Sequence, residues 1–170
     1  DDGSCVSDSG PALFQFNQSP LQSFYYIESA TILDFDLDSE DWVGAFKDLD
    51  ADGTGDVCVG ARKWDTSICN NGVCDLALMG VGFLPDTNNF IVPGTENYME
   101  IGDVPVFMVY DQSENTFYDA KTLGDDGYAF EATDFPFAPN GIQIINKISV
   151  IDDCNAELGG HAFTDYCNYC

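Results

Sequence analysis

The stretch 41–63 reads "DWVGAFKDLDADGTGDVCVGARK" and places two short apolar runs on either side of an acidic loop. "DWVGAFK" (41–47) and "DVCVGARK" (56–63) contain the aromatic and β-branched residues that favour strands. The loop between them has carboxylates at alternate positions and Gly53, which permits a sharp reversal of the backbone. The stretch therefore predicts a hairpin of two strands joined by a metal-binding turn.

Similar runs recur along the chain, separated by clusters of Gly, Pro, Asn and Asp. Their apolar residues alternate with a period of two, and no amphipathic segment of helical length carries helix caps. This pattern predicts an all-β fold, a β-sandwich of Ig-like or jelly-roll-like type, in which any helix is a single turn. The further predicted strands are 12–17, 23–28, 31–37, 105–111, 116–121 and 142–150.

Three other segments define the expected organisation. "DQSEN" (111–115) predicts a tight hairpin, because Asp and Asn bond readily to the backbone of a turn. Residues 65–103 are long, weakly periodic and punctuated by Gly, Asn and Pro, so they predict a loop excursion from the sandwich. The polar start and the Cys-rich end predict tethers. We therefore expect an N-terminal tether (1–11), a sandwich domain (12–151) and a C-terminal tail (152–170).

The charge of the chain restricts its partners. Thirty acidic residues stand against five basic ones, which gives a net charge of −25. Such a field repels the phosphates of nucleic acids, so we expect no nucleic-acid partner. No apolar run approaches the roughly 18–20 residues of a membrane span, and we expect none. Bound divalent cations would relieve the repulsion between the carboxylates.

The acidic loop has the ligand pattern of a calcium site, because Ca²⁺ prefers hard oxygen ligands at alternate positions of a tight loop. An EF-hand would need a Glu at the twelfth position and flanking helices, whereas this loop has Val59 and flanking strand-like runs. A solvated acidic turn without metal is the alternative. The candidate ligands are Asp48, Asp50, Asp52, Asp56 and the carbonyl of Thr54.

Seven cysteines and a single histidine make a Cys/His zinc site improbable and favour disulfides in an oxidising compartment. Cys69 and Cys74 enclose the short loop "NNGV" and are candidates for one disulfide. Cys58 lies inside a predicted strand and is expected to be a buried thiol. The connectivity stays open, since six cysteines allow fifteen pairings. A further candidate pair is Cys154 with Cys167, which leaves Cys5 and Cys170 to link successive subunits.

Signatures of catalysis are scarce. The chain has no GxSxG motif, no phosphate-binding glycine loop and only His161, so we expect no enzyme. Trp64 and Tyr98 are candidates for a sugar-binding platform. Asn17 in "NQS" is a candidate N-glycosylation site, although Pro20 follows the motif directly.

Four segments, "SFYYIESATI", "DWVGAFKD", "GDVCVGARKWDTSICNNGVCD" and "GDVPVFMVYDQSENTFYDA", resemble a β-sandwich module of large secreted or surface-anchored proteins of aquatic microbes. The resemblance covers roughly residues 14–120. It implies an extracellular location more than an activity. "DDGSC" and "DCNAELGGHAFTDYC" resemble the Cys-containing linker repeats that join such modules. The resemblance also favours the subunit of an extracellular filament recovered from the environment.

These observations predict an extracellular structural subunit that binds copies of itself head to tail, stabilised by calcium and disulfides. The expected mechanism is β-strand addition, in which a terminal segment pairs with a sheet edge of the next subunit. "PALFQFNQS" (11–19) and "HAFTDYCNY" (161–169) are the candidate donors, and each also fits an edge strand of its own domain. The alternatives are a carbohydrate-binding module and a calcium-dependent adhesion module of a larger surface protein.

Overall fold

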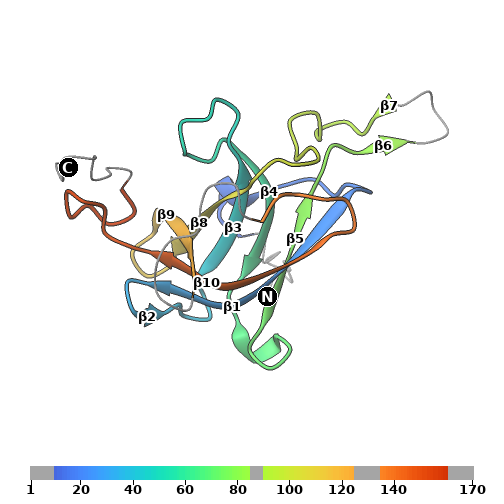
Figure 1. Cartoon of the computed structure of the whole chain (residues 1–170). Coiled ribbons are helices and arrows are strands. Elements are labelled where there is room, and N and C mark those ends of the chain that lie inside the picture. The colour runs from blue at the N-terminus through green and yellow to red at the C-terminus, as the bar shows by residue number, and fades with distance from the viewer. Residues whose placement is uncertain (1–9, 85–89, 125–134, 161–170) are drawn as a thin grey trace, which may run out of the picture.

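The computed structural model describes residues 10–84, 90–124 and 135–160 and is nearly all β (Figure 1), as the sequence predicts. Its helical elements in these ranges are two 3₁₀ turns, η1 (Ala12–Phe14) and η2 (Thr66–Ile68). The strands are β1 (Gln22–Ile32), β2 (Phe35–Asp36), β3 (Trp42–Lys47), β4 (Val57–Lys63), β5 (Cys74–Met79), β6 (Phe83–Leu84), β7 (Phe90–Ile91), β8 (Val106–Asp111), β9 (Thr116–Leu123) and β10 (Ile142–Val150).

One curled, mixed sheet forms a sandwich-like fold, and β9 belongs to both of its halves. The first half has the order β5-β1-β10-β9, with β2 also pairing with β1, and the second half has the order β4-β3-β8-β9. Residues 116–120 of β9 pair with β8, whereas residues 121–123 pair with β10. The two halves are therefore hydrogen-bonded to each other along β9, and the opposite side of the sandwich has to close in another way.

The core lies between the two halves. Tyr25 and Ile27 of β1, Val43 and Ala45 of β3, and Ile145 of β10 belong to one buried cluster. Alternate residues of a strand point to opposite faces, so the period-two pattern places these side chains inside. The hydroxyl of Tyr25 donates a hydrogen bond to the carbonyl of Phe135 at 2.8 Å. The polar end of this large ring is thus satisfied.

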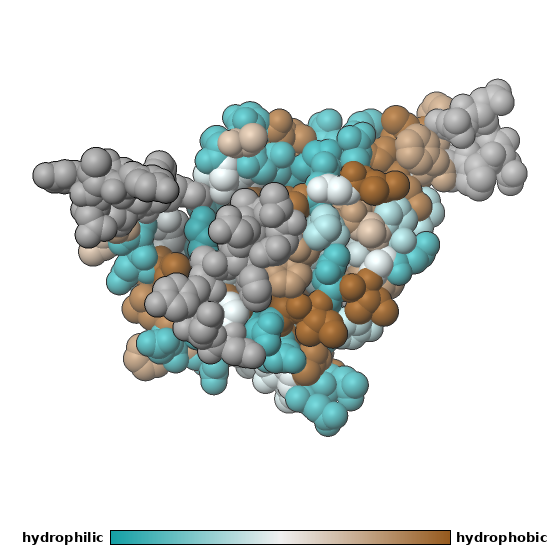
Figure 2. Space-filling model, in the orientation of Figure 1, coloured by the Kyte–Doolittle hydropathy of each residue, from teal (hydrophilic) through white to brown (hydrophobic). Residues whose placement is uncertain are grey.

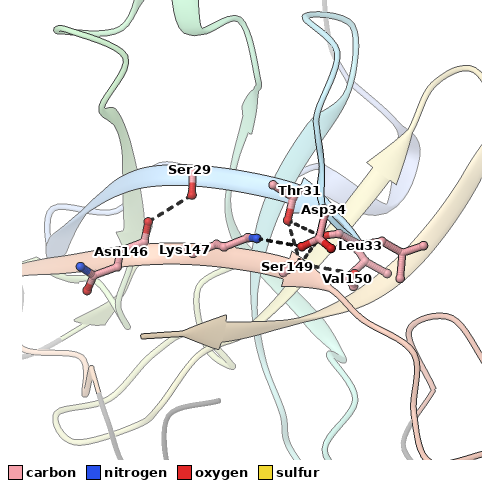
Figure 3. A network of polar contacts seen from close by, with 8 residues as sticks. All are labelled: Ser29, Thr31, Leu33, Asp34, Asn146, Lys147, Ser149 and Val150. Atoms are coloured by element: carbon pink, nitrogen blue, oxygen red, sulfur yellow. Dashed lines mark hydrogen bonds and ion pairs between the residues drawn. The ribbon is translucent and has the colours of Figure 1, made fainter. Parts of the chain in front are cut away.

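The parallel pairing of β1 with β10 is fixed at one end by buried hydroxyls (Figure 3). The side-chain oxygens of Thr31 and Ser149 lie 2.8 Å apart, and each lies within 3.1 Å of the Leu33 carbonyl oxygen. The Leu33 amide donates to the carbonyl of Val150 at 2.7 Å. Because a one-residue slip would leave these groups unpaired inside the protein, the network stabilises the observed register.

The open side of the sandwich closes where β4 meets β5. A Cβ atom added to Gly60 would lie 2.3 Å from the carbonyl oxygen of Ala77, so no other residue fits this approach without a shift. Next to it, the guanidinium of Arg62 contacts both the carbonyl and the carboxylate of Asp75. We call this contact between β4 and β5 the seam.

The N-terminal segment corrects one prediction. Residues 12–17 were expected to form a strand, but Ala12–Phe14 form the turn η1. The turn inserts Phe14 into a second buried cluster, with its ring 5.4 Å from that of Phe46 and 5.5 Å from that of Phe117. Burial of the Phe14 ring thus favours the turn more strongly than the alternating pattern favours a strand. The candidate donor 11–19 therefore lies against its own domain, while the other candidate donor, 161–169, lies outside the described residues.

The remaining strands largely match the predictions. The expected strands 41–47, 56–63, 105–111, 116–121 and 142–150 are present within a few residues. The expected strand 23–28 and the start of the expected strand 31–37 belong to one strand, β1. This strand ends before a turn at Leu33, where φ is +54°. The hairpin at 111–115 is confirmed by the pairing of Asp111 with Thr116. Strand β5 lies within the expected loop excursion 65–103, so that prediction is wrong for these six residues.

The part of the C-terminal tail that the structure describes lies beside β9. Asp152 and Leu158 form an isolated bridge, and the Gly159 amide donates to the carbonyl of Ile151 at 2.9 Å. A Cβ atom on Gly159 would lie 3.1 Å from the amide nitrogen of Asp119. Residues 152–160 thus pack as a small closed loop on the sandwich.

Gly60→Ala tests the seam. We expect this variant to lose about 3 kcal/mol of unfolding free energy, because its methyl group meets a backbone carbonyl that cannot rotate away. Gly102→Ala is the control: no atom lies within 4 Å of a Cβ there, and only the positive φ of +94° opposes the substitution. It should cost about 1 kcal/mol. Equal denaturant midpoints for the two variants would contradict the seam.

Candidate metal centre

The acidic loop joins β3 to β4 and extends from one end of the sandwich (Figure 1). Carboxylate oxygens of Asp48, Asp50 and Asp56 all lie within 4.8 Å of one another. Asp50 and Asp56 are exposed and Asp48 is half-buried. Three negative charges at this separation repel one another, and a divalent cation between them would remove that repulsion. The cluster is therefore able to hold a metal ion.

Backbone amides of the loop hold these carboxylates in place. The Asp48 carboxylate accepts hydrogen bonds from the amides of Ala51 and Gly53 at 2.7 and 2.8 Å. The Asp56 carboxylate accepts one from the amide of Leu49 at 2.7 Å. Ala51 and Gly53 adopt positive φ angles of +63° and +90°, which turns their amides inward. The carboxylates are thus oriented by the loop itself.

Two of the predicted ligands stand apart from the cluster. One carboxylate oxygen of Asp52 accepts hydrogen bonds from both the amide and the hydroxyl of Thr54. Asp52 is not among the three residues whose oxygens converge. The structure therefore brings together Asp48, Asp50 and Asp56. Asp52 is hydrogen-bonded to Thr54 instead. Their role as ligands stays a prediction.

The positive charge nearest in sequence is directed elsewhere. The ammonium group of Lys47 lies 2.8 Å from the carboxylate of Asp103 and donates to the carbonyl of Tyr98 at 3.1 Å. Both partners of Lys47 therefore belong to the segment that follows β7. The ammonium group of Lys47 thus bonds to Asp103 and Tyr98.

A disulfide lies at the other end of β4. Cys69 and Cys74 are bonded, which confirms the predicted pair. The bond closes the turn "NNGV" between η2 and the first residue of β5. Asp65 starts this connection by accepting a hydrogen bond from the Ser67 amide at 3.0 Å. Along the chain, the acidic loop precedes β4, and the disulfide-closed turn lies between β4 and β5.

The other cysteines are partly described. Cys58 is a free thiol that is 6% exposed, as predicted, and burial raises its pKa to about 11. Such a thiol stays protonated and unreactive. Cys154 is disulfide-bonded. Its predicted partner, Cys167, lies outside the described residues, as do Cys5 and Cys170.

The two candidate ligand aromatics are core residues, which corrects that prediction. Trp64 is 3% exposed and Tyr98 is 4% exposed, and both belong to the main buried cluster. The Tyr98 hydroxyl accepts a hydrogen bond from the Asn17 amide at 2.6 Å, and burial raises the pKa of this tyrosine. Neither ring offers a face on which a sugar could stack. Their burial depends on contacts with distant segments, which no local pattern indicates.

The glycosylation motif lies on the surface in part. The Asn17 side chain is exposed, but its amide nitrogen lies 3.4 Å from the carbonyl of Gly94, and Ser19 is buried. Glycosylation of Asn17 stays a prediction.

Asp41 is a polar residue whose role the sequence did not reveal. Its carboxylate is buried and accepts hydrogen bonds from the amides of Asp38 and Gln112 at 2.8 and 3.0 Å. Its carbonyl accepts one from the Trp64 amide at 2.7 Å. Burial raises the pKa of Asp41, and the two amide hydrogen bonds oppose that rise. The only signal in the sequence is an Asp directly before an apolar run.

Comparison with known proteins gives no match. No protein-family model, no curated protein and no solved structure matches the chain. None of the helical segments in the described residues has the length and hydropathy that a membrane crossing requires. The three comparisons thus identify neither a family nor an activity for the chain, nor a metal for the acidic loop.

Calcium should stabilise the protein through the acidic loop. When free calcium exceeds the dissociation constant about 100-fold, binding adds about 2.7 kcal/mol to the free energy of unfolding. This gain raises Tm by about 5–10 °C. Asp50→Ala should remove most of this rise, whereas Asp36→Ala, an exposed acid on β2, should retain it. Calorimetry with calcium and with EGTA gives the comparison. The site is refuted if calcium shifts Tm of Asp50→Ala as much as that of the native protein.

Removal of the disulfide should destabilise the sandwich moderately. The double variant Cys69→Ala/Cys74→Ala frees a short loop, and the chain-entropy estimate for such a loop is roughly 2 kcal/mol. Urea unfolding under oxidising conditions measures the loss. Cys58→Ala, which removes a buried thiol outside any disulfide, separates the cross-link from the effect of a smaller side chain. A double variant as stable as the native protein would show that the bond is dispensable.

Proposed function

We propose that the protein is a structural subunit of an extracellular fibre, which binds copies of itself head to tail and is stabilised by calcium. Catalysis has no part in this function. The observation that carries the proposal is the combination of a strongly acidic chain with large apolar side chains that stay exposed at more than one place on the described surface. Self-association would cover these side chains, and calcium would lower the charge that opposes it.

The acidic loop and the disulfide support a mechanical role. The loop lies before β4, the disulfide closes the turn before β5, and these two strands meet at the seam. A bound ion in the loop and the disulfide would both restrain local opening there, which suits a subunit that transmits tension. Disulfides persist in oxidising surroundings, and calcium is abundant outside cells, so both features favour an extracellular location.

Burial of Phe14 in the second cluster disfavours the segment 11–19 as a donor for strand addition. We therefore propose the other predicted segment, 161–169, which lies outside the described residues, as the donor. Strands β4 and β5 each form a backbone ladder with one neighbour only among the described residues.

The second function we consider is a calcium-dependent adhesion module, which the same loop would serve in a longer protein. Burial of Trp64 and Tyr98 disfavours the carbohydrate-binding alternative.

Native protein at rising concentration should form fibres in calcium. Negative-stain microscopy and sedimentation velocity of the same sample should show oligomers that grow with concentration, and EGTA should shift them toward monomers. Added magnesium at equal ionic strength is the control for simple charge screening. Monodisperse particles in calcium at every concentration would rule out the fibre.

A further inference from the structure

The chain contains two Asn–Gly dipeptides, and the structure places them in different surroundings. Asn71–Gly72 lies in the turn that the Cys69–Cys74 disulfide closes, and Asn140–Gly141 lies directly before β10. In such a dipeptide the glycine amide nitrogen can attack the asparagine side chain, because glycine has no Cβ atom to hinder the approach. Each dipeptide is therefore a candidate site of spontaneous covalent modification.

The turn at Asn71–Gly72 is exposed and has open space around it. It lies in the green loop below β5 in Figure 1, and Figure 2 shows hydrophilic atoms at this protruding end of the molecule. The Val73 amide closes the turn by donating to the Asn70 carbonyl at 3.1 Å. Asn71 is exposed, and a Cβ atom added to Gly72 would meet no atom within 4 Å. No packed neighbour therefore opposes a change in the backbone at this turn.

Both reacting groups of this dipeptide lack hydrogen-bond partners within the described part of the chain. Neither the Gly72 amide nor the Asn71 side chain bonds to a residue that the structure describes. When the hydrogen bond between Val73 and Asn70 opens, the backbone at Asn71 is able to rotate. The amide nitrogen of Gly72 then reaches Cγ of the Asn71 side chain.

The second dipeptide is held by backbone hydrogen bonds. Asn140 is also exposed, and its φ of +58° is close to the +53° of Asn71. The Gly141 amide, however, donates to the Ala138 carbonyl at 2.7 Å. The Asn140 amide donates to the Gln22 carbonyl at 2.6 Å. Exposure and backbone conformation are thus alike at the two sites, whereas the attacking amide is hydrogen-bonded only at Gly141.

We propose that Asn71 is a site of spontaneous deamidation and that the fold protects Asn140 from the same reaction. The Gly72 nitrogen forms a bond to Cγ of Asn71, and the bond between Cγ and Nδ2 breaks. Nδ2 takes the proton of the Gly72 amide and leaves as ammonia, so that a cyclic succinimide remains. Water then opens one of the ring carbonyls and yields aspartate or isoaspartate at position 71. This inference is independent of the proposed fibre.

The reaction changes the chain directly before β5. Either product adds negative charge to a chain whose net charge is already −25. Isoaspartate also lengthens the backbone, which enlarges the ring that the Cys69–Cys74 disulfide closes and alters the Asn70–Val73 bridge. Because β5 meets β4 at the seam, the modified turn leads into the strand that closes the sandwich.

Peptide mapping of the stored, folded, full-length protein tests the proposal. After storage at neutral pH the protein is reduced, digested and analysed by mass spectrometry. Deamidation at Asn71 should be at least about tenfold faster than at Asn140, because opening the second turn breaks additional backbone hydrogen bonds. The products at Asn71 should include isoaspartate, which direct hydrolysis of the side chain does not form. Protein that is reduced and unfolded in guanidinium chloride is the control, and there the two sites should react at similar rates.

Two matched variants identify the site in the intact protein. Asn71→Gln and Asn140→Gln each replace one asparagine by a longer side chain that disfavours ring closure. Isoelectric focusing of the stored native protein should show an acidic species that grows with time. Asn71→Gln should remove most of this species, whereas Asn140→Gln should retain it. Circular dichroism verifies that both variants are folded.

Three results would overturn the proposal. The first is equal deamidation of Asn71 and Asn140 in the folded protein. The second is a folded protein that stays unmodified at Asn71 while the unfolded control reacts. The third is aspartate without isoaspartate at position 71, which excludes the succinimide. None of these results affects the proposed fibre, because that proposal depends on self-association.

Discussion

The approach of β5 to β4 at Gly60 is the constraint on which the rest of the sandwich depends. On one side the two halves share β9, whose backbone hydrogen bonds join them directly. On the other side the halves meet where the Ala77 carbonyl occupies the space that any side chain at position 60 would need. With that approach in place, Tyr25, Ile27, Val43 and Ala45 are enclosed in one core. The acidic loop precedes β4 and the disulfide closes the turn before β5, so an effect of either one on stability would act next to the seam.

Much of this arrangement is predictable from local pattern. The runs around "DWVGAF" and "DVCVGAR" form adjacent antiparallel strands, and three of the four alternating carboxylates between them, Asp48, Asp50 and Asp56, converge as the loop pattern predicts. The pair Cys69–Cys74 follows from a short intervening loop that contains Gly72, where φ is +82°. In each case the decisive contacts join residues that are close in sequence.

The predictions that were wrong concern residues whose positions depend on contacts between distant segments of the chain. Alternation in "ALFQFN" predicts a strand, but Phe14 finds Phe46 and Phe117 and the backbone turns to bury it. Trp64 and Tyr98 look available in sequence, yet both complete the core beneath other strands. Strand β5 lies among turn-forming residues, and its pairing with β1 bridges about fifty positions of sequence. The parallel pairing of β1 with β10 is equally non-local, and no sequence motif indicates it.

Hydrogen exchange of the native protein with calcium and with EGTA tests the central claim most directly. The account holds that the acidic loop stabilises the seam, so a bound ion should slow exchange in the loop, along β4 (Val57–Lys63) and also in β5 (Cys74–Met79), which the loop does not touch in sequence. Equal slowing of β4 and β5 would show that they open as one unit. Slowing confined to residues 48–56, with β5 unchanged, would contradict the account.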